Sequence, residues 1–458
     1  MVKIKSVFLG AIAACCYVLA EENAQTDTLT IEEAVVAAYN NNMGWRASQT
    51  DKKSAEESLT QAKMMILPDI QGRVSTSRSG NRDSTHQSGL SEELHDKTTQ
   101  TSLALTIRQN LFNGFATVNR VKACTNAAKS SDHKLKFDEQ KLILQVINAY
   151  TSIWVGRQKV AALKKKEENL KKAMDSKNTS LEAGAGTPSE LAQAKANYSK
   201  AVYERIEAET ELFTAEADFT KLTNIEAKDK NIELPDLDIQ LPENLDELIA
   251  NAMALNHSVL SKKFEERAEF DNLNVARGAL FPSCNLTISA NRNFRRDTRE
   301  KQLLRQKQLL PATDTTQNAV SASLEVDIPI FSNSPSSGNS YSSIAIANQR
   351  ALKAKFSAED ALLEVKKECV DNWNKYISAG AMIKSSRSAV KSAELSTESN
   401  IEENVMGTKS NTEVLVEENQ LLDARINLAN SRKQKIMSAM TIYALSGNLS
   451  LHTLLKKK

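Results

Sequence analysis

Side chains that commonly carry out chemistry are few in this sequence and stand far apart. The five histidines are isolated, and no two have the spacing that places a pair of metal ligands on one helix. The five cysteines contain no Cys-x-x-Cys pair, so neither a zinc site nor a disulfide framework is indicated. No Ser/His/Asp arrangement or Gly-rich phosphate loop is legible. We therefore expect no catalytic residues, no metal, no cofactor and no enzyme activity.

The remaining candidate residues border two short turns. The segment Gly184–Ser189 interrupts a helical pattern with glycines suited to a helix C-cap and a proline suited to the next helix start. Gly407–Ser410 does the same in the second half of the chain. Three charged residues, Glu190, Lys409 and Glu413, lie at these turns. By their types alone they could simply be solvated helix ends.

The elements that hold these turns are predicted to be long helices. Only 14 Gly and 8 Pro occur among 458 residues, too few turn formers for the roughly three ordinary domains this length suggests. From Leu142 onward, apolar or small residues recur at alternating spacings of four and three, as in a coiled-coil seam. A continuous helix from Thr117 to Glu182 would be about 100 Å long. The net charge of +2 does not favour nucleic-acid binding.

An internal twofold repeat organises the chain. Residues 31–68 align without a gap on residues 245–282, from IEEAVVAAYNNN and LDELIANAMALN to ILPD and LFPS. Each copy is predicted as helix, strand, loop, strand, very long helix, turn and long helix. The predicted divisions are a leader (1–20), a first repeat (21–222, tip 184–189), a linker (223–244), a second repeat (245–447, tip 407–411) and a C-terminal tail (448–458).

Each copy contains two predicted strands. One strand alternates apolar and polar side chains over about ten residues, the length of a tilted transmembrane strand. Its partner is weaker, and a long polar connection joins the two. The strands are expected at 66–77 and 101–112 in the first copy and at 281–291 and 319–331 in the second, with connections Arg78–Gln100 and Arg292–Asn318.

Alternation alone is equally typical of a half-buried strand in a soluble sheet. The long polar connections favour a barrel of the outer-membrane type, which carries such loops. Arg108, Glu325 and Asp327 lie on the polar faces of the stronger strands. Because a charge facing lipid is costly, we expect these three residues to line the lumen of a barrel.

The N-terminus is predicted to be a secretory signal peptide. Two lysines precede the apolar run Ser6–Ala20, and small residues stand near its end. Cleavage after Ala20 suits ordinary signal peptidase, whereas Ile12–Cys15 resembles a lipobox with Cys15 as the lipidated residue. We favour cleavage after Ala20 because the apolar run continues past Cys15. No later apolar stretch reaches the roughly 18 residues of a membrane helix.

Four strands cannot close a barrel, and a lone sheet in lipid would expose unpaired edge groups. Several chains must therefore pool their strands. Their long helices, side by side, would form a hollow cylinder. The fold class is mainly α with a four-strand β contribution, and it predicts an oligomeric exported channel. The alternative is an exported periplasmic coiled-coil structural or adaptor protein without a pore.

The landmarks of the chain, in their order and duplication, resemble the TolC-type outer-membrane efflux proteins, or outer membrane factors. The segment LTIEEAVVAAYNNN begins the first copy. The segments ILPDI and LFPSCNLTIS lie at the start of the first predicted strand of each copy. The segments LTIRQNLFNG and LEVDIPIFSN lie at the end of the second predicted strand of each copy. Near the end of the second copy, GTKSNTEVLVEENQLLDARINLANSR is followed by ALSGNL. The resemblance covers essentially the whole mature chain.

This resemblance implies a homotrimer in the outer membrane, with a shared transmembrane β-barrel continued by an α-helical tunnel through the periplasm. The implied partners are outer-membrane lipid, a periplasmic adaptor (membrane fusion protein) and an inner-membrane pump of the RND, MFS or ABC type. The implied function is a passive exit duct in tripartite efflux or type I secretion. The cargo would be drugs, dyes, metals or polypeptides, depending on the pump.

The resemblance also assigns residues to the two tips. It implies that Glu190 and Glu413 are acids of the periplasmic constriction and that Lys409 ties adjacent helices shut. Three copies of Glu413 around a narrow lumen would raise one another's pKa. The sequence departs from the family pattern at Asn404 and Val416, where an aromatic gate residue and a second acid are expected. The implied adaptor contacts at the tips are Gly184, Thr187, Pro188, Gly407 and Thr408.

Overall fold

A computed structural model gives the structure of most of the chain. The residues it describes are 28–87, 90–228, 230–234, 241–303, 306–330, 340–406 and 408–455. The predicted leader with Cys15, and Gly407 at the second tip, lie outside these residues.

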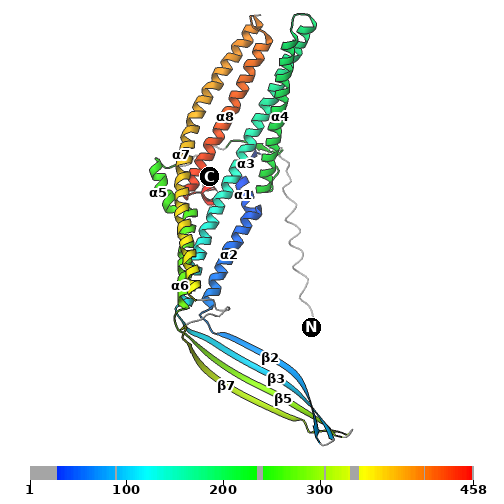
Figure 1. Cartoon of the computed structure of the whole chain (residues 1–458). Coiled ribbons are helices and arrows are strands. Elements are labelled where there is room, and N and C mark those ends of the chain that lie inside the picture. Colours follow the sequence, from blue (N-terminus) through cyan, green and yellow to red (C-terminus); the bar gives the residue numbers. More distant parts are fainter. Residues whose placement is uncertain are drawn as a thin grey trace, which may run out of the picture. The chain divides into compact units, whose positions relative to one another are not determined.

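The helices of the two halves correspond closely in length, which confirms the internal twofold repeat (Figure 1). The short helices each have 11 and 22 residues in both halves. The long helices have 67 and 66 residues, and the returning helices 36 and 35. The first half contains α1 (Ile31–Asn41), α2 (Met43–Met64), α3 (Ala116–Glu182) and α4 (Pro188–Thr223), and the second half contains α5 (Leu245–Leu255), α6 (His257–Gly278), α7 (Ser340–Val405) and α8 (Asn411–Leu445).

Residues of the predicted α3 seam, such as Leu142, Val146 and Ile153, are buried, as the heptad-like spacing predicts. Among the described residues, no helix is both long and apolar enough to serve as a membrane span.

The chain divides into two compact units, and neither unit is one repeat. One comprises Met1–Trp45, Glu139–Leu248 and Cys369–Lys458. The other comprises Arg46–Asp138 and Ile249–Glu368. Each unit therefore combines segments from both halves of the sequence. We call the first the hairpin unit and the second the sheet unit, and the residue limits of the repeats stay predictions.

The sheet unit contains long antiparallel strands that lie side by side in the order β2, β3, β5, β7 (Figure 1). Ser77 of β2 pairs with Gln100 of β3, and Thr287 of β5 pairs with Ser323 of β7. A short strand, β6, extends the β7 side of β5. The strands are β2 (Asp69–Gln87), β3 (Leu90–Asn113), β5 (Ser283–Leu303), β6 (Gln306–Leu309) and β7 (Thr313–Asp327).

The strands are much longer than the sequence predicts. The expected polar connections Arg78–Gln100 and Arg292–Asn318 are wrong, because most of both segments is strand. Apolar residues are sparse in the sequence of these segments, so the alternation that marks a half-buried strand is missing. Backbone pairing between neighbouring strands continues regardless of which side chains they carry.

The hairpin unit holds the apolar core of the long helices. Val160 and Leu163 of α3 pack with Ala208 of α4 in one buried cluster. Leu212 of α4 and Ile426 of α8 pack against this cluster, so α8 joins the α3–α4 hairpin. Small residues such as Ala208, only 1% exposed, let the helices approach closely.

Short segments fasten the ends of the chain to the hairpin unit. β1 (Thr28–Leu29) pairs in parallel with β4 (Asn231–Ile232) inside the predicted linker. The hydroxyl of Tyr150, on α3, lies 2.7 Å from the carbonyl of Leu29 and 2.9 Å from that of Glu233. The predicted C-terminal tail includes a further helix, α9 (Leu451–Leu455), whose first N–H donates to the Glu139 carboxylate at 3.0 Å.

Candidate functional site

The first helical tip lies between α3 and α4 and is built by two opposite caps. Gly184 has φ +76°, so it ends α3 in the left-handed conformation that glycine tolerates best. Thr187 begins α4 as its N-cap, with its Oγ accepting the N–H of Glu190 at 3.3 Å. Pro188 follows at the first helical position. These residue types fix a tight turn, and whether the tip contacts an adaptor stays a prediction.

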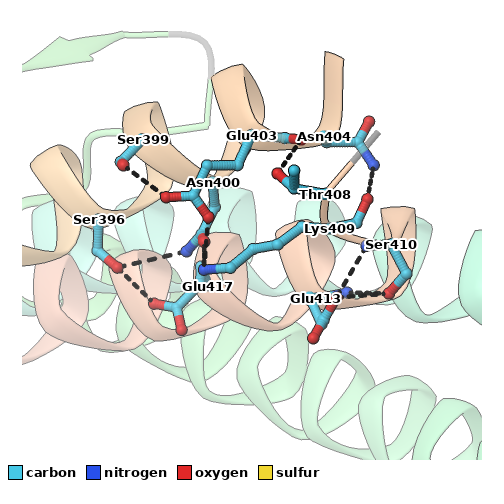
Figure 2. A network of polar contacts seen from close by, with 10 residues as sticks. All are labelled: Ser396, Ser399, Asn400, Glu403, Asn404, Thr408, Lys409, Ser410, Glu413 and Glu417. Atoms are coloured by element: carbon cyan, nitrogen blue, oxygen red, sulfur yellow. Dashed lines mark hydrogen bonds and ion pairs between the residues drawn. The ribbon is translucent and has the colours of Figure 1, made fainter. Parts of the chain in front are cut away.

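The second tip lies between α7 and α8 and is held by a network of polar contacts (Figure 2). The hydroxyl of Thr408 donates to the carbonyl of Glu403 at 2.8 Å. The side-chain amide of Asn404 donates to the carbonyl of Lys409 at 2.8 Å. The first bond satisfies a carbonyl in the last turn of α7, where carbonyls lack helical partners, and the second joins α7 to a carbonyl of the connection.

Lys409 turns its side chain back along α7 (Figure 2). Its Nζ donates to Oδ1 of Asn400 and forms an ion pair with Glu403 at 3.3 Å. Asn400 is only 4% exposed, so Lys409 satisfies a buried acceptor as well as a surface carboxylate. Lys409 thus joins the connection to α7 of the same chain. One feature of the sequence indicates these partners, since Asn400 and Glu403 are three residues apart on a helix and share a face.

Glu413 completes a capping box with Ser410 at the start of α8. Its carboxylate accepts the Ser410 N–H at 2.8 Å and the Ser410 hydroxyl at 2.9 Å. These hydrogen bonds hold the pKa of Glu413 below its usual range within one chain. Three clustered copies of Glu413 are expected to raise its pKa, whereas the hydrogen bonds within a single chain lower it.

Glu190 belongs to the other tip and pairs with Lys177 of α3 at 3.2 Å. The two residues line a pocket of about 280 Å³ together with Thr412 and Val416 of α8. The structure therefore brings Glu190 beside α8. Glu190 pairs with Lys177 and Lys409 pairs with Glu403, so the three predicted gate residues do not form one cluster.

The two departures from the family pattern have structural roles of their own. Asn404 supplies the amide that closes the second tip, as described above. Val416 is 49% exposed and faces the pocket beside Glu190. Its neighbour Glu417 accepts a hydrogen bond from Ser396 of α7 at 3.1 Å, which joins the two helices of the hairpin.

The second tip also presents an apolar surface. Val405 is 84% exposed and Met406 is 78% exposed, at the point where α7 ends. Two adjacent apolar side chains so fully exposed make this turn a candidate interaction surface. Nothing in the sequence distinguishes these two residues, because they continue the helical pattern that precedes them.

The sheet has one apolar and one polar face. Residues that pair directly across strands share a face, and side chains alternate along each strand. Val74, Leu105, Ile288, Val320 and Leu324 lie on one side, which we call the apolar face, and each is between 38% and 81% exposed.

The other side, the polar face, carries all three predicted lumen residues. Arg108 pairs with Thr287, Glu325 with Asn285 and Asp327 with Ser283. The three β5 partners, Ser283, Asn285 and Thr287, are alternate residues of one strand and point to the same side of the sheet, so the three charges share this face. The placement agrees with a lumen-lining role, which stays a prediction.

Two histidines that are isolated in the sequence meet in the sheet unit. The Nδ1 atoms of His133, on α3, and His257, at the start of α6, are 3.4 Å apart. Phe264 stacks on the His133 ring, with 5.4 Å between centroids. Burial, followed by the nearby His133 and Lys136, lowers the pKa of His257 to about 4.

The expectation of isolated histidines is therefore wrong for this pair. Their spacing is non-local, and periodicity does not detect it. Within the described part of the chain, no group of three or more His, Cys, Asp or Glu residues is arranged to hold a metal ion.

Comparisons with known proteins agree with this architecture. The outer membrane efflux protein BepC of Brucella suis biovar 1 is 25% identical over 447 residues, covering 97% of this chain and 91% of BepC. The outer membrane protein TolC of Vibrio cholerae serotype O1 is 22% identical over 416 residues, covering 88% of this chain and 87% of TolC.

The crystal structure of the Campylobacter jejuni CmeC outer membrane channel matches the fold with a TM-score of 0.68 at 16% identity. The match covers 96% of this chain and 93% of CmeC. A sequence model of the family described as outer membrane efflux protein matches residues 19–224 and 248–448, which is most of the chain. The chain therefore belongs to the outer membrane efflux protein family.

Proposed function

We propose that this outer-membrane protein works as a homotrimer and forms the passive exit duct of a tripartite export system. The exposed apolar face of the sheet supports this proposal most directly. A single chain leaves that face uncovered, and lipid is the environment that covers it without cost. The polar face, with Arg108 and Glu325, would then line a water-filled lumen.

The partners follow from the architecture of the family. The protein would act with a periplasmic adaptor and an inner-membrane pump of the RND, MFS or ABC type. The pump would supply the energy and choose the cargo, whether small molecules or polypeptides. The duct itself would carry out no reaction. The competing interpretation, an exported adaptor without a pore, loses its basis with the family match.

The periplasmic end of the duct would be held closed partly by the second tip. Lys409 joins the connection to α7 through Asn400 and Glu403, and the Ser410–Glu413 capping box fixes the start of α8. Breaking the Lys409 contacts would let the end of the α7–α8 hairpin move. Glu190, paired with Lys177 beside α8, would set the position of the first tip against the second.

Single-channel conductance in a planar bilayer tests both the duct and its gate. We expect folded wild-type trimer to conduct weakly, and Lys409→Met to raise the conductance or open probability several-fold. Lys172→Met is the matched control, because the ion pair of Lys172 is with Glu168 on the same helix and not with a residue of either tip. Its conductance should equal that of the wild type.

Two results would count against these proposals, and they differ. A folded oligomer that never conducts, even as Lys409→Met, would contradict the duct. Clear conduction that is identical in wild type, Lys409→Met and Lys172→Met would leave the duct intact and reject the gate.

A further inference from the structure

The apolar face of the sheet changes character partway along the strands. From Ile288 to Ala290 of β5, the side chains facing this way are apolar. Beyond them come Arg292, Phe294 and Arg296, which share the face because they alternate along one strand. This change lies toward the ends of the strands where β2 connects to β3 and β5 connects to β6. The opposite ends of the strands connect to helices.

Neighbouring strands add cations at the same level. Arg78 of β2 lies in the same cross-strand row as Arg296, two strands away and so about 10 Å distant. Lys97 of β3 lies in the next row. We call Arg78, Lys97, Arg292 and Arg296 the cationic belt.

The belt carries more positive than negative charge. The belt spans four cross-strand rows, which are those of Arg292, Phe294, Arg296 and Lys97. Among the described side chains of these rows on the apolar face, Asp314 is the only acidic one, and it pairs with Arg296 at 3.0 Å. On the polar face at the same level, arginines are balanced by acids instead. Arg295 pairs with Asp297 at 2.9 Å, and Arg299 pairs with Asp96 at 3.2 Å.

An aromatic residue lies within the belt, between Arg292 and Arg296 on β5. The guanidinium of Arg292 lies 4.8 Å from the centroid of the Phe294 ring. A cation that stacks on an aromatic ring at the end of an apolar surface is suited to the interface between hydrocarbon and water. The side chain can rest its apolar part on the ring and direct its charge toward the headgroups.

We infer that the cationic belt binds the phosphate groups of lipid headgroups in the leaflet beside it. Arginine presents a planar fork of donors that matches phosphate oxygens. The belt lies directly next to the surface assigned to hydrocarbon, so a bound headgroup would keep its acyl chains on the apolar face. The inference rests on the outer-membrane location of the protein, not on its conduction.

Lipid binding to the detergent-solubilised oligomer tests this inference, with bound lipid counted by native mass spectrometry. The probes are bisphosphorylated lipid A, phosphatidylglycerol and zwitterionic phosphatidylcholine. In Arg78→Gln/Arg292→Gln, affinity for the phosphate-exposing lipids should fall roughly 30-fold, since each cation near an anionic surface contributes about fivefold. Phosphatidylcholine binding should not change.

Two further double variants make the test selective. Arg73→Gln/Arg295→Gln removes two cations from the polar face and should bind lipid A like the wild type. Arg78→Lys/Arg292→Lys keeps the charge and should retain most of the affinity. A loss confined to lipid A assigns the site to the glycolipid, and an equal loss of phosphatidylglycerol assigns it to phosphate in general.

The inference is overturned if the wild type binds phosphatidylcholine as tightly as lipid A. It is also overturned if the polar-face variant loses as much affinity as the belt variant. Conductance of the same preparations is measured separately, so a failure of the belt leaves the duct proposal untouched.

Discussion

At the scale of single residues, the histidine pair shows how a fold creates properties that no segment has. His133 and His257 come from different helices and pack beside Phe264. The pKa of both imidazoles is lowered, first by burial. The charged groups near the pair or its aromatic neighbour are Asp132, Lys136, Lys129 and Arg267.

The pair predicts a pH dependence of stability. The pKa of His257 is about 4 in the folded chain and 6.5 ordinarily, so the unfolded state binds the extra proton between these values. Its contribution to stability is fully present above about pH 6.5 and is lost as the pH falls toward 4.

We expect the thermal unfolding temperature of the oligomer to fall across this window, and to fall less steeply in His257→Gln. His452→Gln is the control, and it should follow the wild type. Parallel curves for wild type and His257→Gln would contradict the assignment.

At the scale of elements, the two tips have the same construction and different surfaces. Both end one long helix and begin the next with a hydroxyl N-cap, Thr187 in the first and Ser410 in the second. The second adds the exposed pair Val405 and Met406. The caps explain the turns, whereas the apolar pair has no role within one chain.

We therefore predict that Val405 and Met406 contribute to adaptor docking. Val405→Asp/Met406→Asp should abolish dye efflux in a bacterial strain that lacks its own channel and is complemented with this one. Burying two carboxylates at an apolar contact costs far more than leaving them in water. Val405→Leu/Met406→Leu keeps the surface apolar and should retain efflux.

The double Asp variant should still conduct in a planar bilayer, which separates docking from folding. Full efflux by that variant would show that the apolar pair lies outside the contact.

At the scale of the whole molecule, the sheet is incomplete in one chain. Within the described strands, β2 pairs only with β3 along its length, and the outer edge of β7 is open. Open edges in lipid leave backbone groups without partners, at several kcal/mol each. Copies of the chain can satisfy these edges by pairing the β7 of one copy with the β2 of the next. The apolar face then points outward around a closed wall.

This arrangement predicts opposite results for neighbouring residues of β7. Leu324→Arg places a charge on the apolar face and should cost about 2–4 kcal/mol near the bilayer midplane. Ser323→Arg places the same side chain on the polar face and should be tolerated. The measurement is the amount of SDS-resistant oligomer in the outer-membrane fraction. Equal yields of the two variants would contradict the assigned faces.

The sequence by itself determined the repeat, the long helices, the two tips and the existence of alternating strands. These features are local, because helix caps, heptad spacing and alternation are each readable within a short window. The placement of Arg108, Glu325 and Asp327 on the polar sides of their own strands follows from the same local alternation.

Only the tertiary structure decided the length of the strands, the meeting of His133 and His257, and the partners of Lys409 and Glu190. Strands with two polar faces pair through their backbones, which leaves no periodic signal in the side chains. Contacts between α3 and α6, or between the first tip and α8, join residues far apart in the chain. Such contacts depend on how the elements pack, and packing brings together residues that no local pattern relates.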